Sequence, residues 1–302
     1  MPLHPPSGQL RRHDAFHSAF LDHDRDVLVW LPPGYERVPH EGSSRGFITG
    51  VHHEGSPEVN HGGSPSSGTF ARNRRYPVLY MHDGQNLFEP ETAFQKGEHW
   101  RLGETAAELI AAGRIEPLVI VGIYNTGDTR VHEYTPTRDA KLGGGRAGDY
   151  GRMIVEELKP LIDRTYRTRS DAASTGLGGS SLGGLVTLHL GFAHPRVFGR
   201  LAVLSPSVWW DRRVILKTVR QARSKPPSRI WLDMGTAEGR KGLDDARLLK
   251  AALVGLGFTP GVDLQYAEYE GATHSETAWA ERVAPMLEWL FPADSADYQG
   301  RR

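Results

Sequence analysis

The residue pattern most suited to chemistry is Gly-Ser-Ser-Leu-Gly at residues 179–183, which reads as G-x-S-x-G. A short apolar run, residues 175–177, precedes it, and a helix-like stretch, residues 182–193, follows it. In a strand-to-helix elbow the serine takes a strained backbone conformation, and small neighbours let strand and helix approach closely. The pattern alone is weak in a chain with 35 glycines. Its setting between a strand and a helix makes Ser181 the best candidate nucleophile.

A serine hydroxyl is a poor nucleophile at neutral pH, so it needs an imidazole to take its proton and a carboxylate to orient that imidazole. His274 follows the last predicted strand and precedes the last predicted helix, where a Ser-acid-His chain order places the base. His82 ends another predicted strand and is the main rival, although it lies upstream of Ser181. The alternative for His274 is a surface residue at a helix N-terminus capped by Thr273 or Ser275.

The preferred acid is Glu238, because it lies just past the predicted strand between those of the serine and the histidine. Asp211, which follows two tryptophans, is the second choice. Asp233 is disfavoured because it falls within a predicted strand. An ordinary solvated loop carboxylate is the alternative for Glu238.

An oxyanion hole needs two backbone N–H groups that point at one position. The elbow geometry makes the Leu182 N–H the first donor. The second is expected in the glycine-containing turn His-Asp-Gly-Gln-Asn at residues 82–86, where we favour the Gln85 N–H. The alternative for this loop is a tight turn with no ligand role.

Apolar runs and helical stretches alternate after Tyr76, which predicts a mostly parallel sheet with helices on both faces. The candidate residues fall at the carboxyl ends of the strands, where such sheets bind ligands. Two further strands, at residues 15–21 and 25–31, are expected to enter the sheet antiparallel. The other predicted strands are 77–81, 118–124, 175–177, 201–204, 230–234 and 264–269, and the predicted helices are 100–112, 149–162, 182–193, 214–223, 244–256 and 276–290.

The length of 302 residues suits one large α/β domain, residues 1–302, with an insertion at residues 38–75. The insertion is rich in Gly, Ser, His, Pro and Arg, so it buries too little apolar surface to offset its ordering entropy, and we expect a mobile loop. His52, His53 and His61 lie in it without a fixed spacing. A solvated loop is therefore favoured over a metal site, and no metal is assigned.

The chain has 36 basic and 36 acidic side chains, so no net field favours nucleic acid or an anionic membrane as a partner. The chain has no cysteine, which excludes disulfides, thiolate metal sites and cysteine nucleophiles. No apolar run is long enough to span a bilayer, and the N-terminus has no apolar signal region. We expect a soluble, cytoplasmic protein unless a leader has been removed. The oligomeric state is not predicted.

Several stretches together resemble an esterase family of the α/β-hydrolase superfamily that is related to enterochelin esterase catalytic domains, feruloyl and acetylxylan esterases and the mycolyltransferases. The resemblance implies Ser181 as nucleophile, Glu238 as acid and His274 as base. It also implies Gln85 and Leu182 as oxyanion donors, and no cofactor. The matching stretches are LPPGY at 31–35, YPVLYMHDGQNLF at 76–88, RVHEYTP at 130–136, GGSSLGGL at 178–185, SPSVWWD at 205–211, GTAE at 235–238 and HSETAWAER at 274–282.

Four further residues near the expected site are candidates for substrate contact. Trp209 and Trp210 follow a strand end, where exposed indoles would suit an aromatic or sugar-bearing ester, and burial in the core is the alternative. Arg130 and Glu133 could contact a polar substrate group or form a structural ion pair.

These observations predict a serine ester hydrolase that acts through an acyl-enzyme on a small-molecule substrate. The expected substrates are small esters or esters linked to an aromatic group or a sugar. Acyl transfer to an alcohol acceptor is the alternative within enzymes. The alternative from another class is a non-catalytic binding protein on the same fold.

Overall fold

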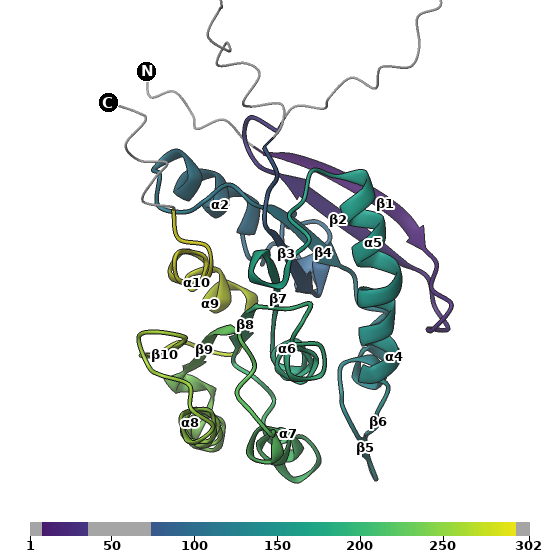
Figure 1. The fold of residues 1–302 in the computed structure, drawn as a ribbon. Coiled ribbons are helices and arrows are strands. Elements are labelled where there is room, and N and C mark those ends of the chain that lie inside the picture. The colour runs from purple at the N-terminus through teal and green to yellow at the C-terminus, as the bar shows by residue number, and fades with distance from the viewer. Residues whose placement is uncertain (1–7, 36–73, 294–302) are drawn as a thin grey trace, which may run out of the picture.

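The structure is a computed structural model that describes residues 8–35 and 74–293. Within these residues, an eight-stranded sheet has the order β1-β2-β4-β3-β7-β8-β9-β10 (Figure 1). β1 pairs antiparallel with β2, β2 pairs antiparallel with β4, and the other neighbours are parallel, so the predicted sheet type is confirmed. The strands are β1 (Gln9–Phe16), β2 (Arg25–Leu31), β3 (Val78–His82), β4 (Val119–Ile123), β7 (Thr175–Ser180), β8 (Arg200–Leu204), β9 (Arg229–Gly235) and β10 (Leu264–Tyr269).

Helices cover both faces of the sheet and enclose two apolar clusters. Figure 1 shows α2, α9 and α10 on one side of the central strands and α4, α5 and α6 on the other. The helices are α2 (Leu102–Ala111), α3 (Arg130–Glu133), α4 (Ala147–Arg152), the π-helical η3 (Met153–Leu158), α5 (Lys159–Thr165), α6 (Leu182–Ala193), α7 (Trp210–Gln221), α8 (Arg240–Gly255), α9 (Glu276–Ala280) and α10 (Val283–Leu290). Short 3₁₀ turns are η1 (Gly84–Asn86), η2 (Gly127–Thr129), η4 (Ala172–Ser174) and η5 (Thr236–Glu238), and β5 (Arg138–Asp139) pairs with β6 (Gly143–Gly144) in a separate ribbon.

The central strands are apolar because both faces are covered. Every residue of β3 and β4 is buried, which is typical of central strands in a parallel sheet. β1 lies at the edge and has no buried residue. The prediction of a first strand at residues 15–21 was wrong, because an edge strand rich in charged residues lacks the apolar run by which strands are detected.

The predicted helix at residues 276–290 is interrupted between α9 and α10. Pro285 lies in the first turn of α10, where its missing N–H costs no intrahelical hydrogen bond. Arg282, at the interruption, is fully buried. The break therefore brings a cation into the interior beneath the carboxyl ends of β8 and β9.

The insertion predicted at residues 38–75 lies outside the described residues except for Arg74 and Arg75, and His52, His53 and His61 lie outside them as well. No helix within residues 8–35 and 74–293 is long and apolar enough to cross a membrane. The same part of the chain contains no group of three or more His, Asp or Glu side chains arranged to hold a metal ion.

Candidate active site

Ser181 occupies a sharp turn between β7 and α6. Its backbone angles are φ 59° and ψ −120°, a conformation that non-glycine residues rarely adopt. The Ser181 N–H donates to the carbonyl of Leu204 at 3.1 Å, and its Oγ lies 3.3 Å from the Oγ of Ser207. The turn holds the half-buried hydroxyl at the carboxyl end of the sheet.

The elbow depends on close contact between the start of α6 and the end of β8. A Cβ added to Gly184 would lie 2.8 Å from the carbonyl oxygen of Leu204 and 3.2 Å from Cα of Pro206. Both neighbours are backbone atoms, which cannot swing aside as a side chain would. Glycine is therefore required at position 184 for the helix to start where it does.

Glu238 and His274 are in contact at the ends of neighbouring strands. The Nδ1 of His274 lies 2.6 Å from Oε2 of Glu238. The Glu238 side chain is only 3% exposed, whereas that of His274 is 46% exposed. The His274 ring also packs edge-on against Trp279, with 4.8 Å between ring centroids. No hydrogen bond joins His274 to Ser181, although both lie among the described residues.

The second oxygen of Glu238 is held by three donors. Its Oε1 accepts from Oγ of Ser205 at 2.6 Å, from N–H of Gly235 at 2.8 Å and from Nη2 of Arg282 at 3.3 Å. Burial acts to raise the pKa of Glu238, but hydrogen bonds from His274, Ser205 and Gly235 outweigh it and lower the pKa below its ordinary value. Glu238 is therefore a fixed anion beside His274.

Behind Glu238 lies a buried polar cluster that the sequence analysis missed. Ser205 Oγ accepts hydrogen bonds from Nε1 of Trp279 at 3.0 Å and Nη1 of Arg282 at 2.9 Å. The same guanidinium bonds Oδ1 of Asp233 at 2.9 Å. Burial raises the pKa of Asp233 to about 6, against the opposing effects of Arg282 and Trp231. A single arginine on the otherwise apolar face of the predicted helix 276–290 was the available signal.

The two alternative acids occupy other positions. Asp233 faces Arg282 within β9 and makes no hydrogen bond to His274. Asp211 has left-handed backbone angles at the start of α7, and its ion-pair partner is Arg212 at 3.8 Å. Of the three carboxylates considered, Glu238 is the one in contact with His274.

The turn after β3 lies beside the elbow, because β3 and β7 are neighbours in the sheet. Gln85 is the central residue of η1, and its carbonyl accepts from Oγ1 of Thr92 at 2.7 Å. Its side-chain Oε1 accepts from the Asn125 N–H at 3.3 Å. Leu182 is the first residue of α6, so its N–H has no acceptor within the helix.

The rival histidine, His82, is buried at the end of β3. Its Nδ1 lies 2.9 Å from the hydroxyl of Tyr150, and its Nε2 has no hydrogen-bond partner. Burial lowers the pKa of His82 to about 3, so the ring is neutral at ordinary pH. His82 makes no contact with a carboxylate of the kind that His274 makes with Glu238.

The four candidate substrate contacts divide into buried and accessible residues. Trp210 is fully buried, and its Nε1 donates to the carbonyl of Thr137, whereas Trp209 is 45% exposed. Glu133 is buried, and both its oxygens accept from Arg25, so its carboxylate is engaged within the protein. Arg130 pairs with Asp83 and keeps a quarter of its side chain exposed.

Solved structures share this arrangement of strands and helices. The enterobactin esterase FES from Shigella flexneri has a TM-score of 0.67 at 19% identity, covering 96% of this chain and 62% of that one. The IroE-like serine hydrolase from Shewanella oneidensis has a TM-score of 0.66 at 20% identity, covering 94% and 80%. The fold of this protein is that of an α/β-hydrolase, as the sequence predicted.

The family described as "Putative esterase" matches residues 65–290, which is most of the chain, and the protein belongs to this family. It is 30% identical to the ferri-bacillibactin esterase BesA of Bacillus subtilis over 224 residues, 66% of this chain and 73% of the relative. It is 27% identical to the uncharacterized protein YbbA of the same species over 235 residues, 72% and 86% of the two chains. Identity to the endo-1,4-beta-xylanase/feruloyl esterase of Xylanibacter ruminicola is 26%, and there the chain spans only 27% of the relative. The protein is a carboxylic ester hydrolase.

Proposed function

We propose that this hydrolase cleaves esters through an acyl-enzyme on Ser181, with His274 as general base and Glu238 as its orienting acid. The observation that carries the proposal is the 2.6 Å contact between Nδ1 of His274 and Oε2 of a buried, anionic Glu238. A carboxylate on Nδ1 fixes the tautomer that leaves Nε2 as the proton acceptor. The strained backbone of Ser181 supports its role as nucleophile.

In the proposed reaction, Ser181 Oγ attacks the ester carbonyl carbon as its proton passes to Nε2 of His274. The carbonyl oxygen becomes an anion that accepts hydrogen bonds from the N–H groups of Gln85 and Leu182. The tetrahedral species collapses, the C–O bond to the alcohol breaks, and His274 returns the proton to the leaving oxygen. Water then attacks the acyl-enzyme by the same route and releases the acid and free Ser181.

We further propose that the ester carries an aromatic group or is linked to a sugar. Trp209 is 45% exposed and lies two residues after Ser207, whose Oγ contacts the Ser181 hydroxyl, and an exposed indole offers a flat apolar surface to an aromatic group or a sugar. One relative is named as an endo-1,4-beta-xylanase/feruloyl esterase, and the feruloyl group is aromatic, which supports this proposal.

The test is hydrolysis of p-nitrophenyl acetate, butyrate and octanoate and of methyl ferulate by the wild type and by Ser181→Ala. We expect Ser181→Ala to lower kcat by a factor on the order of 10⁴ or more, and the wild type to hydrolyse methyl ferulate. Folding of both proteins is checked by circular dichroism. Equal rates would refute the nucleophile assignment, and no hydrolysis of methyl ferulate would refute the aromatic substrate. A product that appears only when an alcohol acceptor is added would favour acyl transfer over hydrolysis.

A further inference from the structure

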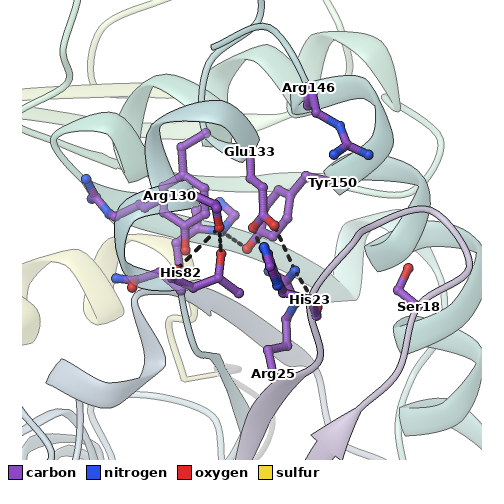
Figure 2. A network of polar contacts seen from close by, with 12 residues as sticks. Ser18, His23, Arg25, His82, Arg130, Glu133, Arg146 and Tyr150 are labelled. Atoms are coloured by element: carbon purple, nitrogen blue, oxygen red, sulfur yellow. Dashed lines mark hydrogen bonds and ion pairs between the residues drawn. The ribbon is translucent and has the colours of Figure 1, made fainter. Parts of the chain in front are cut away.

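Asp83 is a buried anion at the base of the turn that carries Gln85. It directly precedes η1 and adopts left-handed backbone angles, φ 56° and ψ 46°. Aspartate is one of the few residues besides glycine that adopt this conformation, and contacts from neighbouring residues fix it here. Figure 2 shows part of the polar network in this region, with Arg130, His82 and Tyr150 labelled.

The Asp83 side chain is held mainly by Arg130. The guanidinium is bidentate: Nε donates to Oδ1 and Nη2 donates to Oδ2, each at 2.7 Å. Asn125 Nδ2 donates to Oδ1 at 2.7 Å as well. Burial acts to raise the pKa of Asp83, but the charge and hydrogen bonds of Arg130 and the bond from Asn125 lower it further than burial raises it. Asp83 is therefore ionised at neutral pH.

The Asp83 backbone is held by the same group of residues. Its N–H donates to the Tyr134 hydroxyl at 3.1 Å, and the Arg130 guanidinium lies 4.9 Å from the centre of the Tyr134 ring. The main chain of Asn125 donates to Gln85 Oε1, so Asn125 contacts both ends of the turn. The direction of the Gln85 N–H thus depends on how firmly Asp83 is fixed.

The carboxylate of Asp83 also lies close to the proposed oxyanion site. A Cβ added to Gly183, in the first turn of α6, would be 3.4 Å from Oδ2 of Asp83. Gly183 follows Leu182, the other proposed oxyanion donor. An uncompensated anion beside the residue that follows Leu182 would oppose the negative charge that develops on the substrate carbonyl, because electrostatic interactions are strong in a site sheltered from water.

We propose that Arg130 is a positioning residue that acts through Asp83: it fixes the left-handed turn that aims the Gln85 N–H, and it neutralises the carboxylate beside the oxyanion. The inference rests on the proposed function. It assigns Arg130 an effect on the transition state and none on substrate binding. A substrate-binding role would be different, because Arg130 would then contact the ester directly and affect KM.

The two roles are separated by a double-mutant cycle of Arg130→Gln and Asp83→Asn. Arg130→Gln leaves a buried anion beside the oxyanion, and we expect kcat to fall about 100-fold with KM changed by less than about twofold, on the scale of a lost oxyanion donor. Asp83→Asn removes the charge that Arg130 neutralises. The double variant should therefore recover at least about tenfold in kcat over Arg130→Gln alone, since directly contacting residues are not additive.

Two controls accompany the cycle. Arg152→Gln removes an exposed arginine whose ion-pair partner is Glu156, four residues further along the chain, and it should retain wild-type kcat and KM. If Arg130→Gln does not fold, Arg130→Lys replaces it, because lysine keeps the charge and loses the bidentate geometry. We then expect an intermediate loss of kcat from the lost bidentate geometry, and Asp83→Asn should not restore it because the lysine already neutralises the carboxylate.

A rise in KM on loss of Arg130 that persists unchanged in the Asp83→Asn background would overturn the inference and make Arg130 a substrate contact. Failure of the proposed function gives a different result, since Ser181→Ala would then keep its activity. Purely additive losses of kcat, with Ser181→Ala inactive, would likewise refute the coupling through Asp83 while leaving the nucleophile in place.

Discussion

Ser205→Ala is the perturbation that tests how Glu238 is held. Ser205 Oγ is the nearest of the three donors to Oε1 of Glu238, at 2.6 Å, and it also accepts from Trp279 and Arg282. The substitution removes only the oxygen. Gly235 and Arg282 still donate to Glu238, and Arg282 keeps its bond to Asp233.

The magnitude follows from the bonds that are lost. A hydrogen bond to a charged group contributes about 1.5–3 kcal/mol, and each 1.4 kcal/mol in the barrier is about a factor of ten in rate. If the Ser205–Glu238 hydrogen bond acts mainly by orienting His274 through Glu238, kcat falls about 10- to 100-fold with little change in KM. The Trp279 N–H is left buried without an acceptor, so the free energy of unfolding falls by about 1–3 kcal/mol.

The pH dependence gives a second readout. The Ser205 hydrogen bond is one of the contacts that lower the pKa of Glu238, so its removal raises that pKa. In the proposed mechanism, activity falls at low pH both when the base His274 is protonated and when Glu238 is protonated, and only the second contribution moves with the pKa of Glu238. The contribution of Glu238 to the acid-side loss should therefore begin at a higher pH in Ser205→Ala than in the wild type.

The assay is kcat and KM for a p-nitrophenyl ester from pH 4 to pH 8, together with urea unfolding. Ser228→Ala is the matched control, because Ser228 is also a buried serine but its Oγ has no hydrogen-bond partner. We expect the control to keep wild-type kcat. Wild-type kcat and an unchanged pH profile in Ser205→Ala would refute the view that this hydroxyl orients Glu238.

Three further predictions concern other parts of the site. Burial lowers the pKa of His82 to about 3, so between pH 7 and pH 5 the unfolded chain takes up a proton that the folded protein does not. The free energy of unfolding should therefore fall by about 2 kcal/mol more in the wild type than in His82→Phe over this range. The same pH dependence of the free energy of unfolding in both proteins, measured in urea, would contradict this. Gly184→Ala should abolish most activity, because its Cβ would clash with the Leu204 carbonyl oxygen. Gly148→Ala in α4, whose Cβ would contact no other residue, should be neutral or stabilising by up to about 1 kcal/mol. Equal thermal midpoints for the two variants would contradict the close approach at Gly184. Arg282→Met should lower the free energy of unfolding by about 3–5 kcal/mol, because it leaves the buried Asp233 without its ion-pair partner. A loss under about 1 kcal/mol in urea unfolding would show that the pair contributes little.

The fold could be predicted largely because central strands and crossover helices leave strong local signals. The runs at β3, β4 and β9 are continuous and apolar, and α6 has the predicted bounds. β7 was predicted too short, since its second half is Gly-Gly-Ser, which has low strand propensity and is extended only because β3 and β8 flank it. The break between α9 and α10 places Arg282 against Asp233, an ion pair between residues 49 positions apart.

The residues of the candidate site also differ in whether the sequence could predict them. Ser181, Glu238 and His274 could be proposed because each follows a strand end, and parallel topology brings strand ends together. The supporting residues could not, because Ser205, Asp233 and Arg282 meet only through pairing of β8 with β9 and the inward turn at α10. Likewise, the pairing of Arg130 with Asp83 joins residues 47 positions apart, and composition gives no sign of it.

The most direct test of the central claim is labelling by a fluorophosphonate, followed by mass measurement of the intact protein and peptide mapping. The phosphonyl group should be found on Ser181 at a stoichiometry of about one, activity should be lost in parallel, and folded Ser181→Ala should remain unlabelled. Labelling of another residue, or an unlabelled wild type that still hydrolyses p-nitrophenyl acetate, would contradict Ser181 as the nucleophile.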